Sequence, residues 1–69
     1  MRTLKVVEVK KENGIHQLSL DEAERMVLAA MKQSFMIVVD GEFVKGTSEL
    51  RRILETANEV YIVPPFAGG

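Results

Sequence analysis

The last seven residues of the sequence, Val-Pro-Pro-Phe-Ala-Gly-Gly, combine residue types that suit one kind of chemistry. Gly68 and Gly69 have no side chain, so the walls of a partner's cleft can close around their backbone. The terminal carboxylate, with an ordinary pKa of about 3.3–3.7, is ionised at neutral pH. A carboxylate is a poor acyl donor, but adenylation by ATP converts it into a good one. We therefore predict that Gly69 is the reacting residue and that an adenylating enzyme is its partner.

The residues before the two glycines are predicted to present them to that partner. Pro64 and Pro65 have no N–H group, so a β-ladder cannot continue through them, and they favour an extended polyproline conformation. Phe66 is an apolar residue outside the predicted fold and is expected to anchor the partner. We therefore expect a domain over residues 1–65 and a flexible diglycine tail over residues 66–69. The residues predicted to thread into the partner are Pro64, Pro65, Phe66, Ala67 and Gly68.

The rest of the chain offers no second reactive group. The sequence has no cysteine, which removes disulfides, a thiol nucleophile and thiolate metal ligands, and its one histidine lies in no cluster with ligand spacing. No Ser/His/Asp arrangement or pair of carboxylates indicates a catalyst. We expect a protein co-substrate with no metal and no bound cofactor. We interpret His16 as a solvated strand residue, and Glu49, Arg51 and Arg52 as a solvated helix face whose arginines have an acidic partner as the alternative.

Size and charge limit the classes of protein to which this chain can belong. The 69 residues are enough for one small domain, and the 9 basic residues nearly balance the 10 acidic ones. This balance argues against a nucleic-acid-binding domain, which normally carries a basic excess. The first residues have no long apolar run, so they predict neither a signal peptide nor a membrane span. We expect a cytoplasmic protein that binds no membrane.

Two Xaa-Gly pairs predict β-hairpins. Asn13-Gly14 separates a valine-rich segment from a second short apolar segment, and Asp40-Gly41 follows the apolar run of residues 35–39. Both pairs favour a type I′ turn, which needs positive φ at both central residues. The continuous run predicts a strand with both faces at least partly covered. A two-residue turn at the first site places four apolar side chains on one face, pairing Val9 with Leu18 and Val7 with Leu20. Leu4 and Val6 are out of phase with that face, so either the strand is buried on both sides or a bulge intervenes.

One long helix is predicted from about Leu20 to Gln33. Ser19 and Glu22 have the spacing of a capping box. Residues 47–55 predict a second helix of two turns at most, capped by Thr47 or Ser48, and residues 60–63 predict the last strand. Met26 and Met31 are interpreted as core residues. The apolar face of the long helix comprises Leu20, Ala23, Val27, Ala30 and Met31.

The order strand, strand, helix, strand, strand, short helix, strand favours an α+β roll of the β-grasp kind. A crossover helix returns the chain to the same sheet, and a single long helix covers one face of it. A ferredoxin-like arrangement needs two comparable helices, and the second one here is too short. The last strand is therefore expected beside the first and parallel to it, away from the sheet edges.

The segment NEVYIVPPFAGG resembles the end of the ubiquitin-like sulfur carriers of the MoaD/ThiS type. These carriers include the small subunit of molybdopterin synthase and the sulfur carrier of the thiamine pathway. The likeness covers the last dozen residues as a motif, and the whole chain through the order of its elements. The positions that match are Glu59, Val60, Pro64, Pro65, Gly68 and Gly69.

This resemblance implies a mechanism and three kinds of partner. In the family, an E1-like enzyme uses ATP to adenylate the terminal glycine. A sulfur donor of the desulfurase or rhodanese type then gives a thiocarboxylate. A sulfur-accepting synthase or a tRNA receives the sulfur, which here is expected to travel on Gly69.

Two departures leave the pathway open. The family often has an Asp-Gly-Asp turn before the last strand, where this chain has Thr56, Ala57 and Asn58. The short length is closer to the thiamine type, whereas the diproline is closer to the molybdopterin type. Two other functions also remain open: a ubiquitin-like modifier joined to lysines through Gly69, and a plain β-grasp interaction module.

Overall fold

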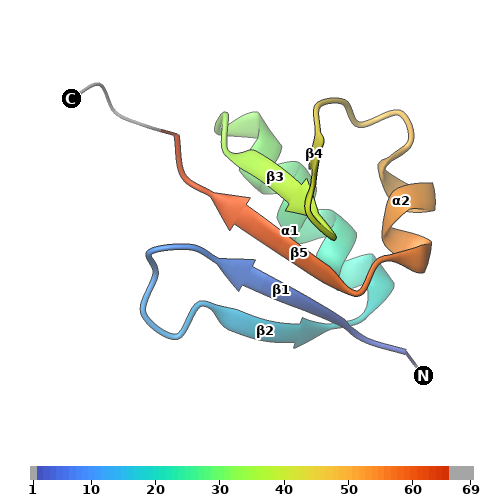
Figure 1. Cartoon of the computed structure of the whole chain (residues 1–69), viewed down its shortest axis with the longest axis horizontal. Coiled ribbons are helices and arrows are strands. Elements are labelled where there is room, and N and C mark those ends of the chain that lie inside the picture. Colours follow the sequence, from blue (N-terminus) through green and yellow to red (C-terminus); the bar gives the residue numbers. More distant parts are fainter. Residues whose placement is uncertain (1, 66–69) are drawn as a thin grey trace.

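The computed structural model describes residues 2–65 and shows one sheet with two helices (Figure 1). The sheet order is β2-β1-β5-β3-β4, so the last strand lies in the middle. β5 pairs with β1 in parallel and with β3 in antiparallel orientation. The elements are β1 (Leu4–Glu8), β2 (Ile15–Leu18), α1 (Leu20–Lys32), β3 (Met36–Val39), β4 (Glu42–Val44), α2 (Leu50–Thr56) and β5 (Glu59–Val63).

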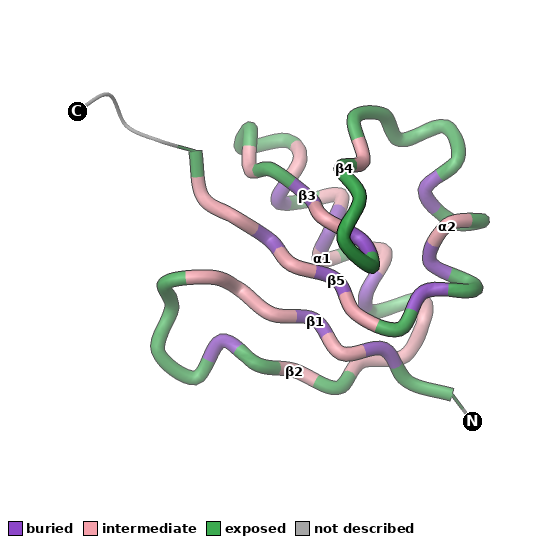
Figure 2. Tube along the Cα trace, in the orientation of Figure 1, coloured by how far each residue is buried: buried purple, intermediate pink, exposed green. Residues whose placement is uncertain are grey.

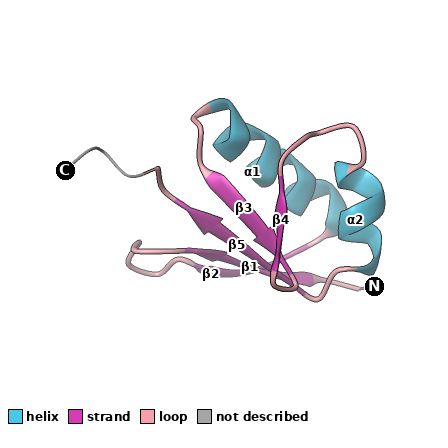
Figure 3. Ribbon diagram, turned by 45° about the horizontal axis from the view of Figure 1, so that its top comes forward, coloured by secondary structure: helices cyan, strands magenta, loops and turns pink. Residues whose placement is uncertain are grey.

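This topology confirms the predicted β-grasp roll. The last strand is central and parallel to the first, as the crossover rule required. Figure 3 shows α1 lying across one face of the sheet, with α2 beside it. Neither helix within residues 2–65 has the length and apolar character needed to cross a membrane.

The start of α1 is fixed by the predicted capping box. The Ser19 hydroxyl accepts a hydrogen bond from the Glu22 backbone N–H, and the Glu22 carboxylate accepts one from the Ser19 N–H. The helix ends at Lys32, with Gln33 as its C-cap, so the predicted span was correct. Ala23, Val27 and Ala30 are buried against the sheet, and Met26 and Met31 pack at the edge of the core as predicted.

The core lies between the sheet and the two helices. Figure 2 shows the buried segments on the inner strands and on the helix faces turned toward them. No buried side-chain N or O atom within residues 2–65 lacks a hydrogen-bond partner. The core residues are Leu4, Val6, Ala23, Val27, Ala30, Ile37, Val39, Leu50, Leu54, Ala57, Val60 and Ile62.

The second hairpin was predicted correctly. Asp40 and Gly41 have φ values of 47° and 88°, and the flanking residues Val39 and Glu42 pair directly. Positive φ at both central positions is the requirement of a type I′ turn. The strands β3 and β4 therefore meet through the shortest connection available to an antiparallel pair.

The register predicted for the first hairpin was wrong. Val7 pairs with Ile15 and Leu4 with Leu18, so a wider loop over residues 9–14 joins β1 to β2. Gly41 is the one glycine in the described part of the chain with positive φ, so no type I′ turn forms at Asn13-Gly14. The reason is burial: Leu4 and Val6 face α1, and the register must place those two side chains in the core.

The predicted cap of the second helix was also wrong. α2 begins at Leu50 with Glu49 as its N-cap, and no side chain caps it. The Thr47 carbonyl accepts the Leu50 N–H in a turn that leads into the helix. The length of two turns was correct, and Leu50 and Leu54 are buried.

Arg51 joins α2 to α1. Its guanidinium donates to the Asp21 carboxylate at 2.7 Å and to Glu24 at 2.9 Å, and these bonds raise its pKa. The acidic partner of Arg51 thus belongs to its own chain. Arg52 pairs with Glu49 at 3.4 Å and stays exposed, as expected of a solvated face.

Candidate functional site: the end of the central strand and the open sheet face

The central strand β5 is held by hydrogen bonds up to its last residue. Val63 pairs with Met36 on β3, and the Val9 N–H donates to the Ile62 carbonyl at 2.9 Å on the other side. The next residue, Pro64, has no N–H to donate, so the ladder cannot continue through it. The point at which the chain leaves the sheet is thus fixed from both sides.

The beginning of β5 is anchored by the turn between β3 and β4. The Asp40 carboxylate accepts hydrogen bonds from the N–H groups of Asn58 at 3.2 Å and Glu59 at 2.9 Å. The Asp40 N–H donates to the Glu59 carbonyl at 3.0 Å. One turn residue therefore fixes the strand that carries the C-terminal segment.

The sheet face opposite α1 carries an apolar row that crosses every strand. Ile15 pairs with Val7, Val7 with Tyr61, Tyr61 with Val38, and Val38 with Phe43. Directly paired residues point to the same face, so these five side chains lie side by side. The two end residues, Ile15 and Phe43, are each 66% exposed. We call this set the open-face row.

The surroundings of the open-face row are different on its two sides. Toward the end of β5, the next pair is Val63 with Met36, and both are apolar. On the opposite side, Lys5 and Glu59 are paired strand neighbours whose charged groups lie 3.6 Å apart. The apolar surface therefore extends toward the place where the C-terminal segment leaves the sheet.

This surface was not predicted from the sequence. The apolar run at residues 35–39 predicted a strand with both faces at least partly covered. Ile37 and Val39 are buried under α1, and Val38 on the other face is partly buried, as predicted. No helix of the described chain lies over that other face, and Met36 on it is 37% exposed. The unbroken apolar run was the sequence signal for this surface. In a strand with one solvated face, apolar and polar residues normally alternate, so an unbroken run indicates apolar side chains on both faces.

The predicted threading residues are only partly described by the structure. Pro64 is half-buried and Pro65 is exposed, directly beyond β5. Phe66, Ala67, Gly68 and Gly69 lie outside the described residues, as does the predicted flexible tail at 66–69. Their roles, and the domain boundary after residue 65, remain predictions.

His16 lies in a charged cluster at the end of β1. Its Nε2 atom lies 2.8 Å from the Glu8 carboxylate, which also accepts a hydrogen bond from the Lys11 ammonium at 3.3 Å. Burial raises the pKa of Glu8, but the bonds from His16 and Lys11 outweigh it and hold the pKa below its ordinary value. Between residues 2 and 65, no three His, Cys, Asp or Glu side chains converge on a common metal position.

A central β5 running parallel to β1, with one helix across the sheet, defines a ubiquitin-like β-grasp protein with an apolar open face. The sequence model of the ThiS family matches residues 4–69, and the chain belongs to this family of ubiquitin-like sulfur carriers. Comparisons with curated proteins and with solved structures each gave no match.

Membership confirms the predicted resemblance and the general role of a sulfur carrier. Members of the family are small carrier proteins and not catalysts. They generally interact with E1-like enzymes and with synthases. The open-face row and the end of β5 are accordingly candidates for the surface that meets such partners.

Proposed function

We propose that this protein carries sulfur as a thiocarboxylate on Gly69. An oxygen of the Gly69 carboxylate attacks the α-phosphorus of ATP bound to an E1-like enzyme, and pyrophosphate leaves. The outer sulfur of a persulfide on a desulfurase or rhodanese-type donor then attacks the carbonyl carbon, and AMP leaves. A thiol reductant cleaves the S–S bond of the resulting acyl disulfide, which releases the thiocarboxylate and leaves a disulfide between the reductant and the donor. The resulting thiocarboxylate delivers sulfur to a synthase of molybdopterin or thiamine biosynthesis, or to tRNA, in the cytoplasm.

The observation that carries this proposal is the position of the open-face row beside the end of β5. An enzyme that adenylates a threaded carboxylate needs both a narrow segment to enter its cleft and a surface that positions this segment. Here the central Tyr61 of the row lies two residues before Val63, where the ladder ends. Exposed apolar residues of this kind mark protein interfaces in general. Docking through the row would present Pro64 and the residues after it to the same partner.

The test is ATP–pyrophosphate exchange with the E1-like enzyme of the same organism. One residue added after Gly69 moves the carboxylate away from the α-phosphate, and reacting atoms must approach to about 3–3.5 Å. Gly68→Val introduces a β-branched side chain where the partner needs bare backbone. Both variants should abolish exchange at saturating carrier concentration and leave the melting temperature unchanged.

The outcomes separate the proposed carrier from its alternatives. Normal exchange with the extended variant would overturn adenylation at Gly69. If exchange depends on Gly69, the intact mass of the carrier recovered after reaction with the enzyme and the sulfur donor shows what happens to the adenylated carboxylate. Replacement of one oxygen by sulfur supports the carrier, whereas covalent joining to lysines of other proteins would show a modifier.

A further inference from the structure

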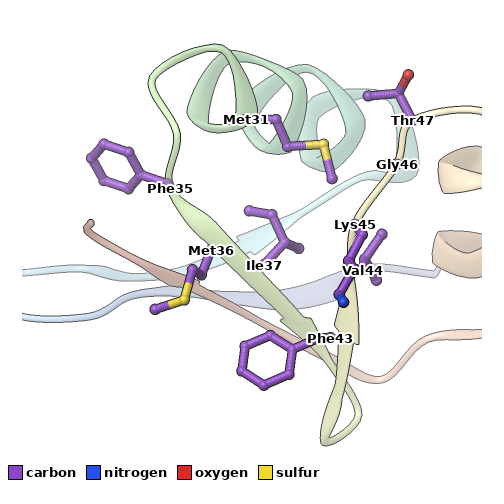
Figure 4. Close-up of a pocket in the computed structure, with 9 residues that line it drawn as sticks. All are labelled: Met31, Phe35, Met36, Ile37, Phe43, Val44, Lys45, Gly46 and Thr47. Carbon is purple, nitrogen blue, oxygen red and sulfur yellow. The ribbon is translucent and has the colours of Figure 1, made fainter. Parts of the chain in front are cut away.

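An apolar groove is lined by residues of α1, β3, β4 and the segments next to them, and it shares Phe43 with the open-face row. It has a volume of about 760 Å³ and lies where β3 and β4 diverge. Pairing between these strands stops at Ile37 and Val44. Figure 4 shows Met31 of α1 above this gap and Ile37 below it, with Phe35 and Lys45 on opposite sides.

The groove gathers most of the large apolar side chains that are exposed in the described chain, residues 2–65. Within residues 2–65, three large apolar side chains are exposed, and two of them, Met36 and Phe43, line this groove. Met31, Phe35 and Val44 are half-buried along it. Apolar surface that gathers in one concave place indicates a binding site more strongly than scattered exposed residues do.

One charge at the rim indicates what the occupant carries. Lys45 lines the groove, is exposed, and forms no ion pair with any residue in the described range 2–65. An ammonium group beside an apolar groove favours a ligand with a carboxylate next to its apolar part. The position of the groove indicates which protein supplies that ligand. Met36, on its wall, pairs with Val63, the last residue of β5.

We propose that the groove binds an apolar side chain of the adenylating partner, and that a carboxylate on the same partner segment pairs with Lys45. This inference rests on the proposed function, because it assigns the groove to the enzyme that takes Gly69. The partner that receives the C-terminal segment covers this end of the sheet, so one docking event fills the groove and presents the tail. The groove is then an affinity determinant that does not touch the reacting carboxylate.

Gly46 offers a direct way to block the groove. A Cβ atom built on Gly46 meets no atom within 4 Å, and the residue does not have positive φ. Gly46→Leu therefore places an apolar side chain in open space, without strain in the backbone. Lys45→Glu reverses the rim charge. The matched control is Arg25→Glu, an exposed arginine of α1 that does not line the groove.

The experiment measures the KM and kcat for each carrier variant in ATP–pyrophosphate exchange with the E1-like enzyme. Gly46→Leu and Lys45→Glu should each raise the KM about tenfold, the effect expected of an interface hot spot, with kcat at saturation unchanged. Arg25→Glu should change neither. A variant with an extended tail should instead lose kcat. A result against the groove proposal, which concerns the KM, is therefore distinguishable from a result against adenylation at Gly69, which concerns kcat.

Three results would overturn the proposal. The first is an unchanged KM for Lys45→Glu, which keeps the test valid even if Gly46→Leu unfolds. The second is dimerisation of the wild type in sedimentation velocity that Gly46→Leu abolishes, because a second copy then occupies the groove. The third result applies if the wild type supports no exchange, in which case binding to the enzyme is measured by calorimetry. If the wild type and Lys45→Glu then bind with equal affinity, the groove is not a docking site.

Discussion

Met36 and Val63 face each other at the last pair between β3 and β5, and the residue after Val63 is a proline without an amide hydrogen. The end of the central strand is thus set by covalent structure as well as by packing. Met36 belongs to the groove wall and Val63 ends β5, and the open-face row crosses at the neighbouring pair on the same face, Val38 with Tyr61. Under the proposed function, a partner that docks at this end of the sheet would contact the folded domain next to the start of the C-terminal segment.

Asp40 is expected to contribute more to stability than its exposed position indicates. Its carboxylate accepts N–H groups of Asn58 and Glu59, and its backbone has positive φ. Asp40→Ala removes these bonds and places an alanine in the left-handed region, so it should cost about 2 kcal/mol of unfolding free energy. Asp40→Asn tolerates that backbone conformation and should cost about half as much. Urea denaturation measures both, and an equal loss for Glu42→Ala would contradict this role.

Gly14 and Gly46 should respond in opposite ways to the same substitution. A Cβ atom on Gly14 would lie 2.4 Å from the Glu8 carbonyl oxygen, whereas one on Gly46 meets nothing within 4 Å. Gly14→Ala should therefore cost about 1–3 kcal/mol, as expected for overpacking against backbone. Gly46→Ala should be neutral or slightly stabilising, because it restricts the unfolded chain. Equal midpoints for the two variants in urea would show that the loop at residues 9–14 relaxes freely.

Most of the fold could be predicted because its signals are local. The capping box of Ser19 and Glu22, the helical spacing of the α1 apolar face and the Asp40-Gly41 turn each depend on a few neighbouring residues. The register of β1 could not be predicted in the same way. Its apolar residues occur in both phases of the strand alternation. Only packing under α1 decides that Leu4 and Val6 face inward.

The candidate site likewise has one part that local sequence signals predict and one part that depends on the folded sheet. Pro64 and Pro65 could be identified from residue type, because a missing N–H group has the same consequence in any sheet. The open-face row could not be identified, because it depends on the register of four strand pairs at once. Ile15 and Phe43 are at the two ends of the row. They belong to one continuous surface only because β5 lies between β1 and β3 and joins the two hairpins into one sheet.

The charged cluster at Glu8 should make stability depend on acidic pH. Because hydrogen bonds from His16 and Lys11 hold the pKa of Glu8 below its ordinary value in the folded state, its carboxylate stabilises the fold above the unfolded pKa of about 4.3. This contribution is lost as the pH falls through the lower, folded pKa. Glu8→Gln should cost about 1 kcal/mol at neutral pH and almost nothing in strong acid. The measurement is urea denaturation between pH 7 and pH 3. The exposed Glu12→Gln is the control and should show no such convergence with the wild type.

The open-face row should be needed for partner activation and not for folding. Ile15 is 66% exposed, so Ile15→Lys removes little buried surface and should leave the melting temperature within a few degrees of the wild type. A charge at the end of the row would have to be desolvated on docking, so the KM for the carrier in ATP–pyrophosphate exchange should rise about tenfold. Gln17→Lys adds the same charge on the same strand and face, beside Lys5 and outside the row, and should change the KM by less than about twofold. Equal effects of the two variants would mean that net charge, and not the row, determines recognition.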